Sequence, residues 1–307
     1  MISMNYLTSP APNGQPITFY YSGVGIDLTA KENGYREFAA NGQKYVVLDT
    51  TLLRAMIADE KLIKKYQKIL PELGVEFCDA HSFYNELDDM CCPDEAIRPR
   101  MLERHKIAMD ISAAFGVDTI TIHMGRFTDH SISPRTHIDY AMKSLEELLP
   151  VAEKLGMVIC IENVWYQTSA ASTLLEAIER FKTPALGVCF DAGHANIMSG
   201  RYRAPENRMW ATYPGREPDW NDHVLDDLFP HIVNCHLHDN NGVLDMHQIP
   251  GDGNVDWKSI MPKLKMAPRL RVFQCEAATA TGVGPNNFTI RKAVDRMYKL
   301  IATDSPL

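Results

Sequence analysis

Long apolar runs and Cys-x-x-Cys motifs are absent from this sequence of 307 residues. No apolar run approaches the roughly 18 residues that a membrane-spanning helix requires, so no membrane partner is expected. The first residues lack the basic stretch and apolar core of a secretory signal. The seven cysteines form no Cys-x-x-Cys pair, which argues against a thiolate zinc site. Because the cysteines are odd in number and most lie singly in apolar runs, we expect reduced thiols and a cytoplasmic location.

Basic residues are also scarce. The chain has 31 Lys and Arg against 39 Asp and Glu, a formal net charge of −8, and it contains no basic run. A protein that binds a nucleic-acid backbone needs a basic surface, so no nucleic-acid partner is expected. The glycine-rich phosphate-binding motifs of nucleotide folds are missing too, so no nucleotide cofactor is expected. A small molecule is the predicted partner, and the sequence leaves a homo-oligomer open.

What the chain does contain is a regular alternation of short apolar strands and longer helices. The strand candidates are residues 17–26, 45–48, 75–79, 119–122, 157–161, 186–190, 231–237 and 270–274. The main helix candidates are residues 35–40, 52–70, 99–115, 136–155, 256–265 and 287–301, with another ending at Phe181. This alternation predicts a parallel sheet, and eight repeats close naturally into a (β/α)8 TIM barrel. A doubly wound open sheet is the competing architecture, and the missing glycine-rich turn counts against it.

The length predicts one barrel domain over residues 1–307, although two average domains would also fit it. Residues 1–16 are expected to be an irregular lead-in, because Pro10, Pro12 and Pro16 interrupt regular structure. Residues from about 194 to 229 form the longest connection and read as an insertion on the loop face. Its aromatic residues could form a lid or a subunit contact; they are Trp210, Tyr213 and Trp220.

Acidic residues or histidines follow six consecutive strand candidates. In chain order they are His81, His123, Glu162, Asp191, His238 and Glu276. In a barrel the carboxyl ends of all strands open into one mouth, so these side chains should converge. Neighbouring buried carboxylates repel one another, and a divalent cation would remove that cost. Mixed nitrogen and oxygen ligands suit Mn, Zn, Co or Fe better than Ca.

The stretch of residues 233–257 concentrates these residue types most strongly. It begins as a strand and continues into a loop rich in Asn, Gly and Pro. The polar residues that crowd it are His236, His238, Asp239, Asp245 and His247. Such a group at a strand end is typical of a metal site or an acid–base site. The alternative is a polar surface loop that happens to contain three histidines.

Together these motifs resemble the xylose isomerase-like barrel superfamily, which contains sugar isomerases and epimerases and also endonuclease IV. The matching pieces are His123-Met-Gly, Ile161-Glu162-Asn163, Phe190-Asp191-Ala-Gly-His194, His236-Leu-His238-Asp239-Asn240, Asp245-Met-His247-Gln-Ile-Pro250-Gly251-Asp-Gly253-Asn-Val-Asp256-Trp257 and Gln274-Cys275-Glu276. They follow the family's order over about residues 75–276. The first two strands and residues 194–229 match weakly.

The resemblance implies a divalent-metal-dependent isomerase or epimerase acting on a sugar, a sugar phosphate or a polyol ketone. In the epimerases of this family, strands five to eight supply the metal ligands, which correspond here to Glu162, Asp191, His238 and Glu276. The two glutamates also act as the acid–base pair. One removes the proton beside a metal-polarised carbonyl, giving an enediolate, and the other returns a proton. The implied cofactor is one divalent ion, which would be Mn, Zn, Co or Mg.

Further residues near the strand ends are candidates for binding the substrate. His194 resembles the family histidine that contacts substrate oxygens, and Trp165 would form an apolar wall or simply pack the mouth. The other substrate candidates are His81, His123 and His247; Asp245 and His247 are possible additional metal ligands. A phosphate or carboxylate could be bound by an arginine, unless these are only surface charges: Arg126, Arg135, Arg201 and Arg203.

The resemblance to endonuclease IV gives the main competing function. That enzyme uses three zinc ions held by nine residues to act at abasic sites. The candidates here are His81, His123, Glu162, Asp191, His194, His238, Asp245, His247 and Glu276. Three points favour the sugar enzyme: sugar-active members also carry the Asp245-x-His247 motif, the loop before Asp245 is short, and the net charge is −8. An inosose dehydratase-like lyase and a non-catalytic metal-binding barrel are the remaining alternatives.

Overall fold

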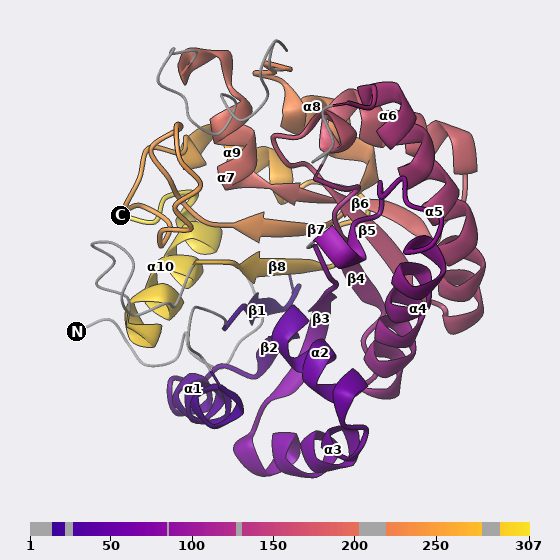
Figure 1. The fold of residues 1–307 in the computed structure, drawn as a ribbon. Coiled ribbons are helices and arrows are strands. Elements are labelled where there is room, and N and C mark those ends of the chain that lie inside the picture. The colour runs from indigo at the N-terminus through magenta and orange to yellow at the C-terminus, as the bar shows by residue number, and fades with distance from the viewer. Residues whose placement is uncertain (1–13, 22–26, 85, 127–130, 203–218, 278–288) are drawn as a thin grey trace.

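The computed structural model describes residues 14–21, 27–84, 86–126, 131–202, 219–277 and 289–307. Eight parallel strands form a closed barrel in which each strand pairs with the next and β1 pairs with β8 (Figure 1). The strands are β1 (Ile17–Phe19), β2 (Tyr45–Leu48), β3 (Glu76–His81), β4 (Thr119–Ile122), β5 (Val158–Glu162), β6 (Leu186–Asp191), β7 (Ile232–Leu237) and β8 (Val272–Cys275). The predicted TIM barrel is confirmed, and the closure between β1 and β8 excludes a doubly wound open sheet.

Helices pack around the outside of this barrel (Figure 1). They are α1 (Leu28–Ala40), α2 (Thr50–Ala58), α3 (Lys61–Leu73), α4 (Arg98–Ala114), α5 (Pro134–Leu155), α6 (Ala171–Phe181), α7 (Ala192–Met198), α8 (Val224–Leu228), α9 (Trp257–Leu264) and α10 (Ile290–Thr303). Strand residues such as Ile120 and Ile159 are fully buried, as are Leu145 and Leu148 of α5. Among the described residues, no helix combines the length and the apolar character needed to cross a membrane.

Two helix predictions near the amino terminus differ from the structure. The helix expected over residues 52–70 is two helices, α2 and α3, because Asp59 between them is extended and accepts a hydrogen bond from the Lys61 amide. The helix expected from residue 35 begins at Leu28, where the Asp27 side chain caps it by accepting from the Ala30 amide. The weak apolar periodicity of that segment hides its first turns.

The floor of the barrel mouth is polar rather than apolar. Asn234 of β7 donates a hydrogen bond to Asp79 of β3, and Thr119 of β4 donates to the same carboxylate. All three side chains are buried. Burial raises the pKa of Asp79 to about 6, and the hydrogen bonds from Thr119 and Asn234 offset only part of that effect. Polar groups therefore continue below the strand ends into the barrel interior.

The predicted lead-in and insertion are described only in part. Residues 1–13 of the lead-in, and Trp210 and Tyr213 of the insertion, lie outside the described residues. The described part of the insertion contains α7, the 3-10 turn Gly200–Tyr202 and α8. Trp220 is partly buried and packs against the core. A single domain over the whole chain stays a prediction.

Candidate metal centre

The carboxyl ends of the strands meet at one mouth, as the order of the motifs predicts. His81, Glu162 and Asp191 are the last residues of β3, β5 and β6, and the other three strand-end candidates follow β4, β7 and β8 directly. The mouth holds a cavity of about 300 Å³. Predicted residues lining it are His81, His123, Glu162, Trp165, His194, Asp245, His247 and Glu276. The sequence therefore identifies most of this cavity.

At the base of the mouth, three carboxylates surround one histidine. Ligand atoms of Glu162, Asp191, His236 and Glu276 all lie within 4.8 Å of one another. His236 Nδ1 lies 2.8 Å from Glu276 Oε2, 3.4 Å from Glu162 Oε2 and 3.7 Å from Asp191 Oδ2. These separations suit atoms that share one ion at about 2.0–2.2 Å each. We call these four residues the central set.

His238, which the sequence analysis assigned as the histidine ligand, lies outside the central set. Its Nε2 is 3.0 Å from Asp191 Oδ2, where it can donate a hydrogen bond to that carboxylate. Its ring stacks on His247 with 3.9 Å between the ring centroids. Gly193 also lies close to the ring, since an added Cβ there would come within 2.1 Å of it. The stack on His247 and the close approach of Gly193 fix His238 as a neighbour of Asp191.

Among the further groups of possible ligands that overlap or adjoin the central set, two bring in the remaining predicted residues. In the first, His123 Nε2 and His81 Nε2 lie 3.1 Å and 3.5 Å from the same Glu162 oxygen. In the second, His247 Nε2 and His194 Nε2 lie 3.0 Å and 3.7 Å from Asp245 Oδ2. The second group also includes His238. The structure thus brings all nine residues considered for three metal ions into adjacent groups, with His236 as a tenth.

Backbone carbonyls orient three of these imidazoles. His81 Nδ1 lies 2.9 Å from the Ser82 carbonyl, and His247 Nδ1 lies 2.8 Å from the Glu276 carbonyl. His194 Nδ1 lies 3.0 Å from the Asn163 carbonyl. A carbonyl only accepts, so Nδ1 carries a proton in each ring, and Nε2 is the nitrogen that faces the other site residues and would bind a metal. Metal-binding histidines are commonly held in this way.

Several buried polar atoms of the mouth have no well-aligned hydrogen bond among the described residues, although some lie within 3.0 Å of a possible partner. They are Glu162 Oε1, Glu276 Oε2, Asp245 Oδ1 and both ring nitrogens of His236. Unpartnered buried carboxylate oxygens are costly, and each of these atoms is close to other potential ligands. A divalent cation among them would satisfy the charges and the lone pairs together. The donor set of oxygen and imidazole nitrogen therefore fits a metal such as Mn, Zn or Co.

The turn from β6 into α7 positions two of the site residues. Asp191 caps α7, and its Oδ1 accepts a hydrogen bond of 2.6 Å from the His194 amide. Asn163, after β5, accepts from the Asp191 amide and donates to the Asp191 carbonyl. The Asn163 side chain therefore locks the ends of β5 and β6 together. Its position beside Glu162 in the motif is explained by this structural role.

The loop after β7 is built around one buried carboxylate, Asp239. Its Oδ1 accepts from the Asn240 and Val255 amides, and its Oδ2 accepts from the Gly251 amide and the Trp257 indole. The conspicuous Pro-Gly-Asp-Gly segment is therefore a scaffold that closes the loop on Asp239. The loop presents Asp245 and His247 to the mouth, and His247 adopts a left-handed φ of 43° to do so.

Electrostatics at the mouth keep the carboxyls ionised. Burial alone would raise the pKa of Glu276, but His236 and His247 lower it to about 2. Burial likewise opposes ionisation of Glu162, yet His236 and His123 hold its pKa well below the ordinary value. Burial would lower the pKa of His247, but Asp245 raises it to about 10. Protonated imidazoles therefore balance the carboxylates when no cation is bound.

This charge balance predicts that metal affinity rises with pH. A bound cation requires neutral imidazoles. At His236, burial lowers the pKa, but Cys189, Glu276 and Glu162 outweigh that effect and raise it well above the usual range. Metal binding should therefore displace protons, while the ionised carboxyls release none near neutral pH. Between about pH 6 and pH 8, the dissociation constant should fall about tenfold per pH unit for each displaced proton. Chelator competition at several pH values measures this; a constant affinity would contradict it.

Aromatic residues form walls of the cavity, and the sequence predicts only one of them. Trp165 is there as predicted, with its ring edge-on to His194 at 4.9 Å between centroids. Tyr20, Tyr84 and Tyr166 also line the cavity and were missed. Tyr20 directly follows β1, so its position at a strand end was the available signal. Such walls suit the apolar face of a small ring or carbon chain.

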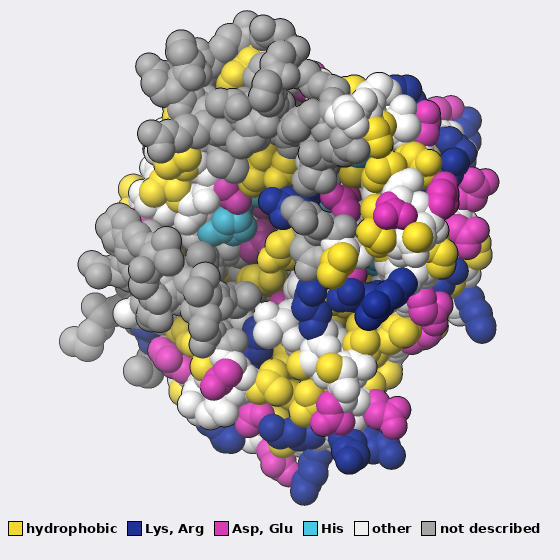
Figure 2. All heavy atoms as spheres, viewed as in Figure 1, with side chains coloured by type: hydrophobic (Ala, Val, Ile, Leu, Met, Phe, Trp, Pro, Cys, Tyr) yellow, Lys and Arg dark blue, Asp and Glu magenta, His cyan; other side chains and the backbone are white. Residues whose placement is uncertain are grey.

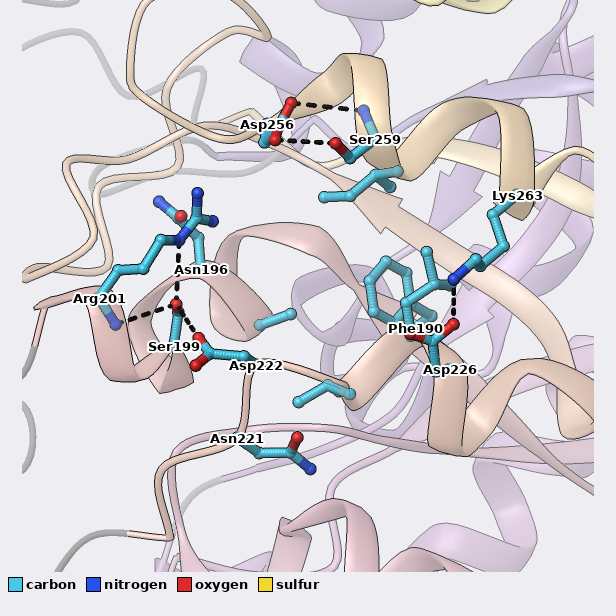
Figure 3. A pocket seen from close by; sticks show the side chains of 14 residues that line it. Phe190, Asn196, Ser199, Arg201, Asn221, Asp222, Asp226, Asp256, Ser259 and Lys263 are labelled. Atoms are coloured by element: carbon cyan, nitrogen blue, oxygen red, sulfur yellow. Dashed lines mark hydrogen bonds and ion pairs between the residues drawn. The ribbon is translucent and has the colours of Figure 1, made fainter.

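The arginines considered for anion binding lie in different places. Arg126 lines the metal cavity. Arg135 lies on α5, exposed, and pairs with Asp139 and Glu176. Arg203 lies outside the described residues. Arg201 lines a second cavity of about 410 Å³ between α7, α8 and α9 (Figure 3), and its Nε donates a hydrogen bond to Ser199 there. The described lining of that second cavity includes none of the predicted metal ligands.

Comparison with known proteins bears on this fold. The family model described as xylose isomerase-like TIM barrel matches residues 29–300. The uncharacterized protein MJ1311 of Methanocaldococcus jannaschii is 27% identical over 210 residues, covering 67% of this chain and 65% of that protein. The chain therefore spans about two thirds of that relative's length.

Two solved structures of similar fold are sugar epimerases or resemble them. A D-tagatose 3-epimerase-like protein has a TM-score of 0.70 at 20% identity, covering 92% of this chain and 96% of its own. A D-psicose 3-epimerase determined in the presence of D-fructose has a TM-score of 0.65 at 14% identity, covering 91% and 89%. At these identities the likeness establishes the fold alone.

Proposed function

The chain belongs to the xylose isomerase-like TIM barrel family, and from that membership we propose that it is a divalent-metal-dependent isomerase or epimerase of a sugar or polyol ketone. The observation that carries the proposal is the central set, in which three buried carboxylates and one imidazole share a space of 4.8 Å. Structural neighbours in this family are sugar epimerases, which supports the same class of reaction.

The metal would be held by Glu162, Asp191, His236 and Glu276. When bound, it supplies a Lewis acid that polarises a carbonyl and acidifies the adjacent C–H bond. We prefer His236 to the predicted His238 because His236 Nδ1 faces all three carboxylates, at 2.8–3.7 Å. His238 would hold Asp191 in position through its hydrogen bond of 3.0 Å.

Glu162 and Glu276 would act as the acid–base pair. Both carboxyls are ionised near neutral pH because neighbouring imidazoles outweigh the effect of burial on each pKa. An ionised carboxylate beside the substrate can accept the proton of the acidified C–H bond. The partner glutamate would return a proton to the opposite face in an epimerisation, or to the adjacent carbon in an isomerisation. The net reaction consumes no oxidant, reductant or water.

The cavity suits a substrate of monosaccharide size. Its volume of about 300 Å³ is at the lower end of small-molecule sites. His194 lines the cavity, and its Nε2 lies 3.7 Å from Asp245, where it could donate to a substrate hydroxyl if no second ion is bound. Trp165 would cover one face of the carbon chain.

Solvent-exchange measurements test this proposal directly. The metal-loaded protein is expected to exchange solvent deuterium into the carbon beside the carbonyl of at least one ketopentose, ketohexose or inositol-derived ketone, offered in neutral, phosphorylated and carboxylate-bearing forms. Proton NMR of a substrate panel in D2O would detect the exchange even when the net conversion is small. Metal removal with a chelator should abolish the exchange, and readdition should restore it. A full panel without exchange would count against an isomerase or epimerase and favour a lyase or a non-catalytic barrel.

A tri-zinc abasic-site nuclease of the endonuclease IV kind is a second candidate. The observation that favours it is the presence of several overlapping or adjacent groups of possible ligands, three of which share Glu162. Against it, Lys and Arg side chains are interspersed with Asp and Glu over the described helices at the right of Figure 2, whereas a DNA backbone needs a basic surface. Elemental analysis separates the two. One metal per chain fits the first proposal, while three, with cleavage of an abasic duplex, would establish the second.

A further inference from the structure

The metal cavity contains a cation that the proposed chemistry does not use. Among the described residues that line this cavity, Arg126 is the one Lys or Arg. The acid–base step needs only the central set, and the guanidinium of Arg126, which stays protonated and has no acceptor, cannot be a metal ligand. Arg126 therefore brings a guanidinium-bearing side chain to a cavity that is also lined by three carboxylate-bearing and four imidazole-bearing residues.

The backbone around Arg126 is held by buried side chains. The Arg126 amide donates a hydrogen bond of 3.0 Å to Asp89 Oδ2. The carbonyl of the preceding Gly125 accepts a hydrogen bond of 2.5 Å from Thr168. Both Asp89 and Thr168 are buried, at 5% and 0% exposure. This segment is therefore fixed on two sides, from the loop after β3 and from the loop after β5.

Gly125 shows how tightly this segment is packed. Its φ of 125° is one that side-chain-bearing residues rarely adopt. An added Cβ would lie only 2.4 Å from Asp89 Oδ1 and from Cys91 Sγ. Glycine is required here, and it lets the chain turn close to Asp89 before Arg126. The position of Arg126 at the cavity wall is thus built into the loop.

Arg126 also lies within reach of a substrate bound at the metal centre. It is three residues from His123, whose Nε2 contacts Glu162 at 3.1 Å. Three residues of chain span at most about 10 Å, which is the length scale of a small sugar with a terminal substituent. A guanidinium presents planar paired donors that match the oxygens of a phosphate or carboxylate.

We propose that Arg126 binds an anionic group, a phosphate or a carboxylate, on the part of the substrate that points away from the carbonyl. This inference deepens the proposed function, on which it rests for the placement of the carbonyl, by naming the substrate class: acidic sugars or sugar phosphates rather than neutral ketoses. The other described arginines considered for this role lie elsewhere: Arg135 is on the exposed face of α5, and Arg201 is in the second cavity.

Binding of small unreactive anions tests the assignment without any turnover. Calorimetric titration of the metal-loaded protein would compare glycerol 3-phosphate, glycerate and uncharged glycerol. The wild type should bind at least one anion, and Arg126→Gln should weaken that binding about ten- to a hundredfold, the usual effect of losing a charged hydrogen-bond donor. Arg126→Lys should fall between the two, because it keeps the charge but loses the paired donors. Arg135→Gln is the matched control and should bind like the wild type.

The results of this titration distinguish a phosphate from a carboxylate ligand. They also distinguish failure of the Arg126 proposal from failure of the isomerase proposal. Tighter binding of glycerol 3-phosphate indicates a sugar phosphate, and tighter binding of glycerate indicates a sugar acid. Equal affinities of wild type and Arg126→Gln, or no binding of either anion by the wild type, would overturn the role of Arg126. Arg126-dependent binding in a protein that exchanges no deuterium into any ketone would instead count against the isomerase proposal alone.

A kinetic comparison gives a second readout once a substrate is found. For an acidic substrate, Arg126→Gln should raise KM about ten- to a hundredfold and change kcat much less, because Arg126 contacts a part of the molecule that does not react. For the matching neutral ketose, the variant and the wild type should have similar kcat/KM. A variant that lost activity equally on both would place Arg126 in the chemical step and contradict the proposal.

Discussion

Replacing Glu162 with glutamine is expected to remove both metal retention and turnover. One oxygen of this carboxylate lies 3.1 Å from His123, 3.4 Å from His236 and 3.5 Å from His81. An amide keeps the shape but loses the charge that holds a cation and accepts a proton. We expect kcat/KM in the deuterium-exchange assay to fall about a thousandfold or more, with metal lost on dialysis.

Glu176→Gln provides the matched control for this substitution. Glu176 lies exposed on α6, paired with Arg135, and its replacement should leave metal content and exchange unchanged. Thermal unfolding of both variants would separate loss of the site from loss of the fold. If Glu162→Gln retained its metal and its exchange rate, the central set would not be the reaction centre.

The barrel could be predicted because its signals are local. Each strand is a short apolar run, and the longest of the following helices, residues 136–155, shows apolar residues three and four apart. The strand-end residues follow from the same pattern, since a parallel barrel gathers all its carboxyl ends at one mouth. Glu162, Asp191 and Glu276 could therefore be assigned to one site although 114 residues separate the first from the last.

Which histidine of β7 joins those carboxylates depends on strand register, which the sequence does not contain. His236 and His238 are two residues apart, so both point to the same side of the strand and look equivalent. In the structure Asp191 pairs with His236, which puts these two residues at the same height in the barrel. The register of β6 against β7 shifts between Val188 and Cys189, so counting residues along either strand would not reveal that His236 pairs with Asp191.

Residues that act through distant contacts were also beyond the sequence. Asp239 reads as one more acidic residue of the loop, and only its four hydrogen bonds identify it as the scaffold of that loop. Arg126 could not be separated from Arg135 before the structure placed one in the metal cavity and the other on an exposed helix. Both cases depend on segments that meet only in the folded chain.

The histidine assignment predicts a clear difference between two variants. If His236 is a ligand, His236→Gln removes one of about four bonds to the metal. Structural zinc binding is worth about 10–16 kcal/mol in all, so losing one ligand should cost about 3–4 kcal/mol, or a few hundredfold in affinity. His238→Gln instead removes a hydrogen bond to Asp191, and such supporting contacts are typically worth about 10- to 100-fold.

Chelator competition on both proteins at one pH measures the two losses side by side. His137→Gln is the control for removing a buried histidine, because His137 lies on α5 near the Cys91 carbonyl and in none of the groups that could hold a metal. It should destabilise the fold without changing metal affinity. A larger loss for His238→Gln than for His236→Gln would restore His238 as the ligand. The histidine ligand must lie level with the carboxylates whose charge the metal balances. In the structure Asp191 pairs with His236, so a ligand role for His238 would require β7 to shift by two residues relative to β6.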